Sequence, residues 1–242
     1  MRYRFKPPLW AWLGLITALA LLVALGSWQM QRGVYKTRLQ AVMDASGAQP
    51  AQPLTRDTQA AGEREAPHVL ARGRYLGERQ LLLDNQGNEG RPGYRVWTPL
   101  RLDDGALLIV DRGWVAQDGD RSRLPEIAVD GAQARELAGL WRPLPQPGMR
   151  LAADGCAGTN WPRVVQYPDA EDLRCLYADL GEAPLAGLLL LDPSAADGYL
   201  RDWRVNASVP PQRHYAYAAQ WYAFAATLLF LFVKLNLRRI PR

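Results

Sequence analysis

His214 is the residue whose type and position best suit a binding site. It stands directly before an uncharged apolar run. Tyr217, Ala218 and Trp221 follow on the same helical face, at i+3, i+4 and i+7. A neutral imidazole there could ligate haem iron while the macrocycle lies against the helix. The alternative is an interfacial histidine beside Arg213, whose long side chain reaches the headgroup region.

A second polar group follows an earlier apolar run. Trp28, Arg32 and Lys36 are spaced i, i+4 and i+8, which predicts one face of a continuing helix. The group combines an aromatic side chain with two cations. It suits either ligand binding or ordinary anchoring, with Trp in the headgroup belt and cations at lipid phosphates.

Other chemistry has no support in the sequence. HExxH, GxSxG, P-loop and GxGxxG motifs are absent, so we expect no enzyme. Cys156, Cys175, His68 and His214 lack the short spacings of a metal site. A disulfide between the two cysteines would close a loop of about 20 residues and stabilise the fold by around 3 kcal/mol. Two unpaired thiols are the alternative.

Two apolar segments position these groups. Residues 10–28 and 215–233 are uncharged, and a membrane span needs roughly 20 such residues. The predicted organisation is a cytoplasmic tail (1–9), a first transmembrane helix (10–28), a periplasmic domain (29–214), a second transmembrane helix (215–233) and a cytoplasmic tail (234–242). Small residues at packing spacing predict helix–helix contact, either between the two spans or with the helices of a partner. They are Gly14, Ala18, Ala20 and Ala24 in the first span and Ala216, Ala219, Ala223 and Ala226 in the second.

The flanking charges set the expected orientation. Lys and Arg precede the first span and follow the second, which indicates that both termini are cytoplasmic. Ala/Leu/Arg-rich usage fits a bacterial inner membrane. A cleaved signal peptide is the rival interpretation of the first span, although its apolar core exceeds the usual roughly 7–15 residues. The formal charge of +5 is spread along the chain, and no motif favours a nucleic-acid partner.

The segment between the spans predicts a β-rich α+β domain of antiparallel strands. Alternation and turn residues predict strands at 68–76, 79–85, 93–102, 106–115, 134–141 and 185–191, with an edge strand at 203–207. The turns at 77–78 and 103–105 predict two hairpins. Residues 32–43 predict a helix continuing from the first span, and residues 169–180 a second helix with an acidic first turn.

Three stretches of this chain resemble the surfeit locus protein one family of cytochrome c oxidase assembly factors. They are residues 25–36 (LGSWQMQRGVYK), 93–115 (GYRVWTPLRLDDGALLIVDRGWV) and 213–221 (RHYAYAAQW). Their order and the two-span topology also agree. Gln212 and Asp111 stand where the family often has Asn, and the cysteine region matches nothing in the family pattern.

The resemblance implies a non-enzymatic membrane factor that helps deliver haem a to oxidase subunit one, with that subunit and the haem a synthesis machinery as partners. His214 would ligate the iron, beside Trp28 and Trp221. Arg32, Lys36 and Arg213 would pair with the propionates. His68 remains possible as a second ligand. The alternative is a scaffold that stabilises nascent oxidase subunits without touching haem; a membrane-tethered periplasmic enzyme is a third.

Overall fold

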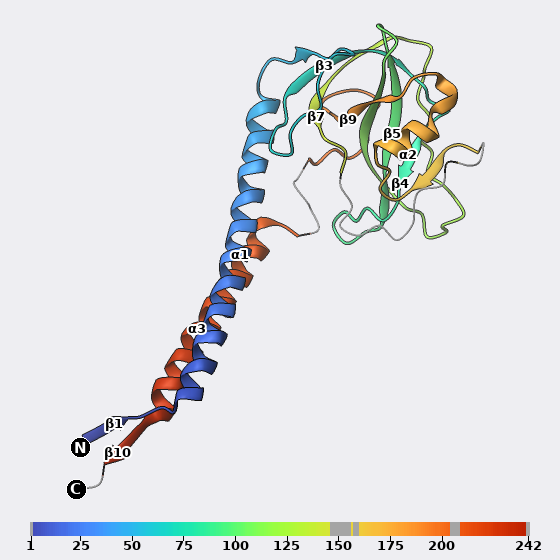
Figure 1. Ribbon diagram of the computed structural model, residues 1–242. Coiled ribbons are helices and arrows are strands. Elements are labelled where there is room, and N and C mark those ends of the chain that lie inside the picture. Colours follow the sequence, from blue (N-terminus) through green and yellow to red (C-terminus); the bar gives the residue numbers. More distant parts are fainter. Residues whose placement is uncertain (1, 146–155, 157–159, 204–208, 241–242) are drawn as a thin grey trace. The chain divides into compact units, whose positions relative to one another are not determined.

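The computed structural model describes residues 2–145, 156, 160–203 and 209–240 (Figure 1). The chain divides into two compact units. Residues 1–38 and 205–242 form what we call the helical unit, and residues 39–204 form the β domain. The expected edge strand at 203–207 falls largely outside the described residues, as does most of the loop at 143–158.

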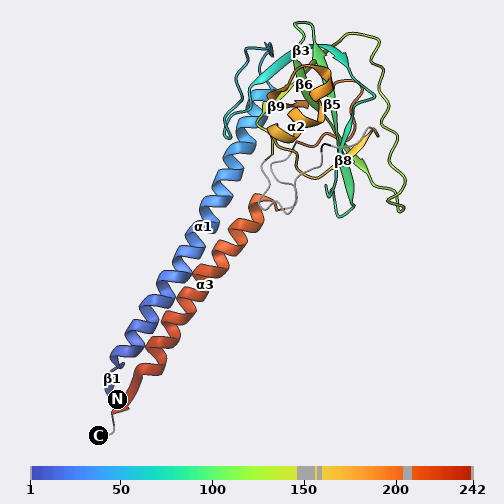
Figure 2. The same ribbon diagram turned by 45° about the vertical axis from the view of Figure 1, so that its right-hand side comes forward.

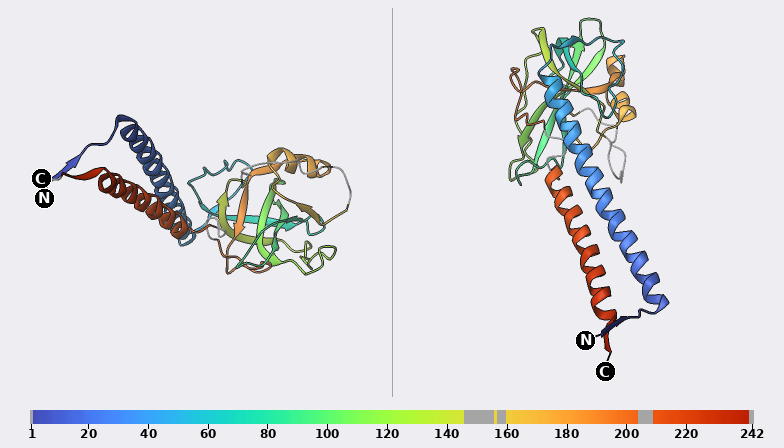
Figure 3. Two further views of the ribbon diagram at one scale, coloured as in Figure 1. Left: turned by 90° about the horizontal axis from the view of Figure 1, so that it is seen from below. Right: turned by 90° about the vertical axis from the view of Figure 1, so that its left-hand side faces the viewer.

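Helix α1 (Leu9–Gly47) and helix α3 (Pro211–Asn236) are long and apolar enough to cross a membrane. The helical unit consists of α1 up to residue 38, the whole of α3 and a short sheet. The two helices lie side by side within this unit and run in opposite directions (Figure 3). Strands β1 (Arg2–Phe5) and β10 (Leu237–Ile240) pair at the free ends of the chain. The predicted continuation of the first helix beyond Trp28 is confirmed.

The two helices do not contact each other through the small residues that we expected. Gly14 has open space around it, and Ala216, Ala219, Ala223 and Ala226 are exposed. Gly26 and Gly33 of α1 instead lie against tyrosine rings of α3, where Ala218 and Ala225 are buried. For contact within the chain the expectation was wrong, because small-residue spacing recurs on more than one face of an Ala-rich helix. Contact of these residues with the helices of a partner stays a prediction.

Eight strands form one sheet in the β domain (Figure 2). They are β2 (Gln52–Pro53), β3 (His68–Tyr75), β4 (Leu81–Leu83), β5 (Gly93–Leu102), β6 (Leu107–Ala116), β7 (Arg135–Arg142), β8 (Arg163–Val165) and β9 (Pro184–Leu191). The order is β2-β3-β7-β9-β6-β5-β4-β8, and a further β3–β5 pairing joins the ring β3-β7-β9-β6-β5 into a closed barrel. The expected antiparallel structure is correct for most pairs. Pairs β2–β3, β4–β8 and β6–β9 are parallel, however.

The apolar run in β6 is buried on both faces. Leu108 and Val110 belong to the core cluster that also contains Trp141. Leu107 and Ile109 belong to a second cluster, covered by helix α2 (Ala170–Leu176). The sequence of a strand that is covered on both faces is continuously hydrophobic, instead of alternating between apolar and polar residues.

One predicted hairpin is confirmed and the other is wrong. Strands β5 and β6 pair around a turn in which Gly105 has φ +89°, a conformation that favours glycine. Strands β3 and β4 do not pair with each other. Both pair with β5, since Tyr75 lies opposite Leu100 and Leu81 opposite Trp97. The ten residues of β5 are long enough to take two partners, so the chain turns a corner at 76–80 instead of folding back.

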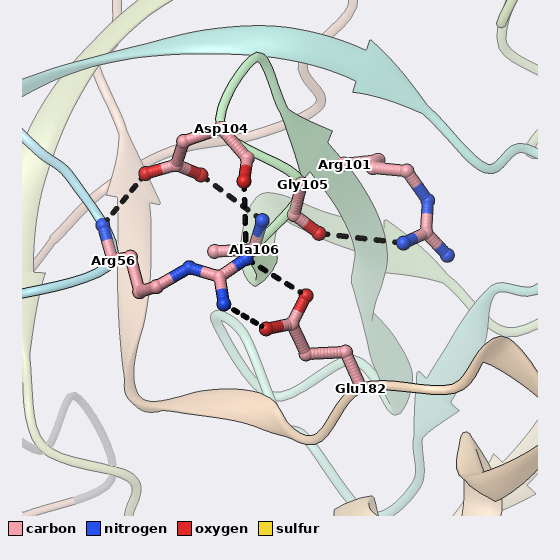
Figure 4. A network of polar contacts seen from close by, with 6 residues as sticks. All are labelled: Arg56, Arg101, Asp104, Gly105, Ala106 and Glu182. Atoms are coloured by element: carbon pink, nitrogen blue, oxygen red, sulfur yellow. Dashed lines mark hydrogen bonds and ion pairs between the residues drawn. The ribbon is translucent and has the colours of Figure 1, made fainter.

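Side-chain contacts hold the ends of these elements in place. Asp169 caps α2 by accepting hydrogen bonds from the Glu171 and Asp172 amides. Cys156 and Cys175 form a disulfide, which decides between the two alternatives for this pair. Arg56 links the β5–β6 turn to the loop before β9, because its amide donates to Asp104 and its guanidinium lies 2.8 Å from Glu182 (Figure 4).

Candidate functional site

His214 lies in the first turn of α3 and faces α1. Its Nδ1 is 2.7 Å from Oε1 of Gln29. A carbonyl oxygen can only accept, so Nδ1 carries the proton and Nε2 has a free lone pair. That Nε2 is buried and has no hydrogen-bond partner among the described residues. The geometry therefore leaves the nitrogen that a metal would use without a competing donor.

Lys36 is the cation that the helix pair buries. Its side chain is only 4% exposed, and its Nζ donates to the Val209 carbonyl at 2.7 Å. Arg32, one turn earlier on α1, is exposed and lies over the Tyr35 ring at 5.7 Å. Arg213 is exposed as well. The structure thus separates the three predicted cations into one buried and two exposed groups.

The two predicted tryptophans lie on the surface of the helical unit. Trp28 is 56% exposed. Trp221 is half-buried and meets Phe224 edge to face, with ring centroids 6.0 Å apart. Trp28 and Lys36 therefore do not share one surface, because Lys36 turns into the contact with α3.

Two tyrosines of α3 contact α1 through the same arrangement, which we call the tyrosine contacts. A Cβ added at Gly33 would lie 2.7 Å from Cε1 of Tyr215, and the Tyr215 hydroxyl is 3.0 Å from Oγ1 of Thr37. Seven residues away on each helix, a Cβ added at Gly26 would lie 2.7 Å from Cε1 of Tyr222, and the Tyr222 hydroxyl is 3.2 Å from Oγ of Ser27.

Sequence reasoning assigned no role to Gln29 or to the tyrosine contacts. Gln29, Gly33 and Tyr215 all stand inside the motifs quoted above, so their presence there was a signal. Their roles could not be read from it, since each role is defined by a partner about 180 residues away in the chain.

His68 is already engaged within the β domain. Its Nδ1 lies 2.6 Å from the Gln49 carbonyl and its Nε2 lies 2.9 Å from the Asp192 carboxylate. Burial lowers the pKa of His68, but the hydrogen bonds to Gln49 and Asp192 outweigh it, so the net pKa is raised above 6.5. With both nitrogens hydrogen-bonded, His68 does not suit a second axial ligand.

The Asp-Arg-Gly-Trp segment of β6 has a structural role. Asp111 is buried and accepts hydrogen bonds from Arg95, Trp97 and the Gly113 amide. Arg112 is 2% exposed and lies over the Tyr75 ring at 5.6 Å. Its guanidinium donates to Gln80 Oε1, the Ile127 carbonyl and the Asp197 carbonyl.

Charge is distributed unequally between the two units. Residues 1–38 and 205–242 contain eleven Lys or Arg and no Asp or Glu. Residues 39–204 contain 18 Lys or Arg and 24 Asp or Glu, a formal charge of −6. Within the described residues, no group of three His, Cys, Asp or Glu side chains could hold a metal ion. An iron at His214 would need a macrocycle for its other ligands.

Comparisons with known proteins agree with the quoted motifs. A family model described as the SURF1 family matches residues 16–226. The cytochrome oxidase assembly protein SHY1 of Saccharomyces cerevisiae is 25% identical over 168 residues, covering 66% of this chain and 42% of the yeast protein. A SURF1-like protein of Drosophila melanogaster is 24% identical over 241 residues, covering 90% of this chain and 74% of the fly protein. The matched part thus spans less than half the length of the yeast relative.

Proposed function

Because the chain belongs to the SURF1 family, we propose that it is a membrane-bound assembly factor for a cytochrome oxidase. The printed name of the yeast relative supports this role. The two apolar helices and the β-rich domain between them agree with a protein anchored at both ends of the chain. The proposal places it in a bacterial inner membrane, with both termini cytoplasmic, the β domain periplasmic and no catalysis of its own.

The finer proposal is that the helical unit holds haem a during its insertion into oxidase subunit one. The observation that carries it is the buried, unpartnered Nε2 of His214, with Gln29 fixing the tautomer. In metal sites, a hydrogen bond from the ring nitrogen that does not bind the metal commonly orients the ligating histidine. The haem would supply the redox-active iron, and this chain would supply the imidazole.

The surrounding residues fit such a group. Arg32 and Arg213 are exposed cations that could pair with the two propionates. Lys36 is buried and already donates to the Val209 carbonyl, so the two exposed arginines carry the proposed propionate contacts. Trp28 is exposed and Trp221 is half-buried, so both offer aromatic surface on the helix pair. The apolar faces of α1 and α3 could leave the long tail of haem a in lipid.

The test is to purify the full chain from a host that makes haem a and to compare its Soret spectrum and haem content with those of His214→Ala. Gln220→Ala is the matched control, since Gln220 is exposed on α3 and, six residues from His214, lies off the face that carries His214, Tyr217 and Trp221. We expect His214→Ala to lose haem and Gln220→Ala to retain it. Equal haem content in all three proteins would remove the ligand role of His214.

The second candidate is a scaffold that binds nascent oxidase subunits without haem. The tyrosine contacts favour it, because they make the helix pair a preformed surface that needs no cofactor. Oxidase subunits that co-purify with His214→Ala, together with normal oxidase activity in those cells, would support the scaffold and contradict haem delivery.

A further inference from the structure

The two free ends of the chain pair with each other. Strands β1 and β10 form an antiparallel sheet with four pairs of opposite residues, from Arg2 and Ile240 to Phe5 and Leu237. The register places Arg4 directly opposite Arg238. Two cationic residues therefore occupy facing positions in a sheet of only two strands.

No acidic residue of the helical unit offsets this charge. Six cations lie in the sheet and beside it, namely Arg2, Arg4, Lys6, Lys234, Arg238 and Arg239. The unit contains no Asp or Glu at all. Like charges directly opposite each other destabilise an antiparallel pair. An isolated two-stranded sheet is itself marginally stable in water. An anion bound between the facing arginines would therefore stabilise the pairing.

Aromatic side chains mark where this sheet meets the helices. Phe5 contacts Trp12 and Phe232 edge to face, with ring centroids 6.1 and 6.0 Å apart. Trp12 and Phe232 are 5.0 Å apart. Phe5 and Trp12 are about 40% exposed. Tryptophan is enriched at the level of the lipid headgroups, so Trp12 is consistent with a sheet that lies beside the headgroup phosphates.

We propose that the β1–β10 sheet binds the headgroup phosphate of an anionic phospholipid, and that this lipid holds the two tails together. Guanidinium groups bind phosphate oxygens in pairs of parallel hydrogen bonds. An anionic headgroup at Arg4 and Arg238 would turn a repulsive pair into a bridged one. Anionic lipids attract cations beside membrane helices generally, but only the facing pair makes strand pairing depend on the lipid.

The experiment measures amide hydrogen exchange of residues 2–5 and 237–240 in the full chain. The chain is reconstituted in vesicles of phosphatidylcholine alone or phosphatidylcholine with phosphatidylglycerol. Pairing protects strand amides, so we expect about fivefold slower exchange in the anionic vesicles, the upper range for relief of one like-charge pair. Inorganic phosphate added to phosphatidylcholine vesicles should give no such protection. Equal exchange in both vesicle types would overturn the proposal, and equal protection by free phosphate would overturn the lipid as its source.

Two charge-matched variants separate the facing pair from general attraction. Arg4→Gln/Arg238→Gln removes the repulsion, so exchange should become the same in both vesicle types. Lys6→Gln/Lys234→Gln removes equal charge from positions outside the facing pair and should retain the lipid dependence. Loss of the dependence in the lysine variant alone, or its persistence in the arginine variant, would contradict the role of the facing pair.

Discussion

Replacing Arg112 by Met should strongly destabilise the β domain. Arg112 is 2% exposed, and its guanidinium donates to Gln80 Oε1 at 2.8 Å, the Ile127 carbonyl at 3.1 Å and the Asp197 carbonyl at 2.7 Å. Met fills similar volume but leaves these oxygens without their donor, each at a cost of about 1–3 kcal/mol. Removal of a buried charge offsets part of this, so we expect the free energy of unfolding to fall by about 3–5 kcal/mol.

Urea unfolding of the full chain in detergent, followed by the fluorescence of buried tryptophans, measures this loss. Arg72→Met is the matched control, since the Arg72–Asp103 ion pair has side chains 69% and 62% exposed. Exposed pairs contribute less than about 1 kcal/mol. If both variants lost the same stability, or if Arg112→Met lost under about 1 kcal/mol, the structural role that we assign to the buried Arg112 would be wrong.

Three further predictions concern other contacts. The pKa of His68 is raised in the folded state, so its ion pair with Asp192 stabilises the domain fully below pH 6.5, and this contribution is lost as pH rises through the folded pKa. The urea concentration at the midpoint of unfolding should therefore fall as pH rises over this range. His68→Gln should remove this part of the pH dependence. Gly33→Ala should weaken the helix pair by about 1–3 kcal/mol in SDS titrations, because its Cβ would meet Tyr215 at 2.7 Å, whereas Gly14→Ala, with nothing within 4 Å, should not. Replacing both cysteines by Ser should lower the Tm of the β domain by roughly 6–12 °C, and an unchanged Tm would show that the disulfide adds no stability.

Local sequence patterns determined most of the secondary structure. Uncharged runs of the right length predicted both membrane helices, and Asp103-Asp104-Gly105 between apolar runs predicted the β5–β6 hairpin. Both features depend on residues that are close in the chain. A membrane helix satisfies its backbone hydrogen bonds within its own segment, and the hairpin turn needs the positive φ that Gly105 adopts. The motifs also identified His214 as the candidate ligand, a role that stays a prediction.

Only the tertiary structure decided which of these residues meet. The turn residues at 77–78 are compatible with a β3–β4 hairpin. The structure instead pairs both strands with the long strand β5, and the β3–β5 pairing closes the barrel. Helical spacing placed Lys36 on the face of Trp28, and contact with α3 buried it instead. The Gln29–His214 hydrogen bond joins residues 185 positions apart. Such pairings depend on how two helices or strands pack, which local periodicity does not specify.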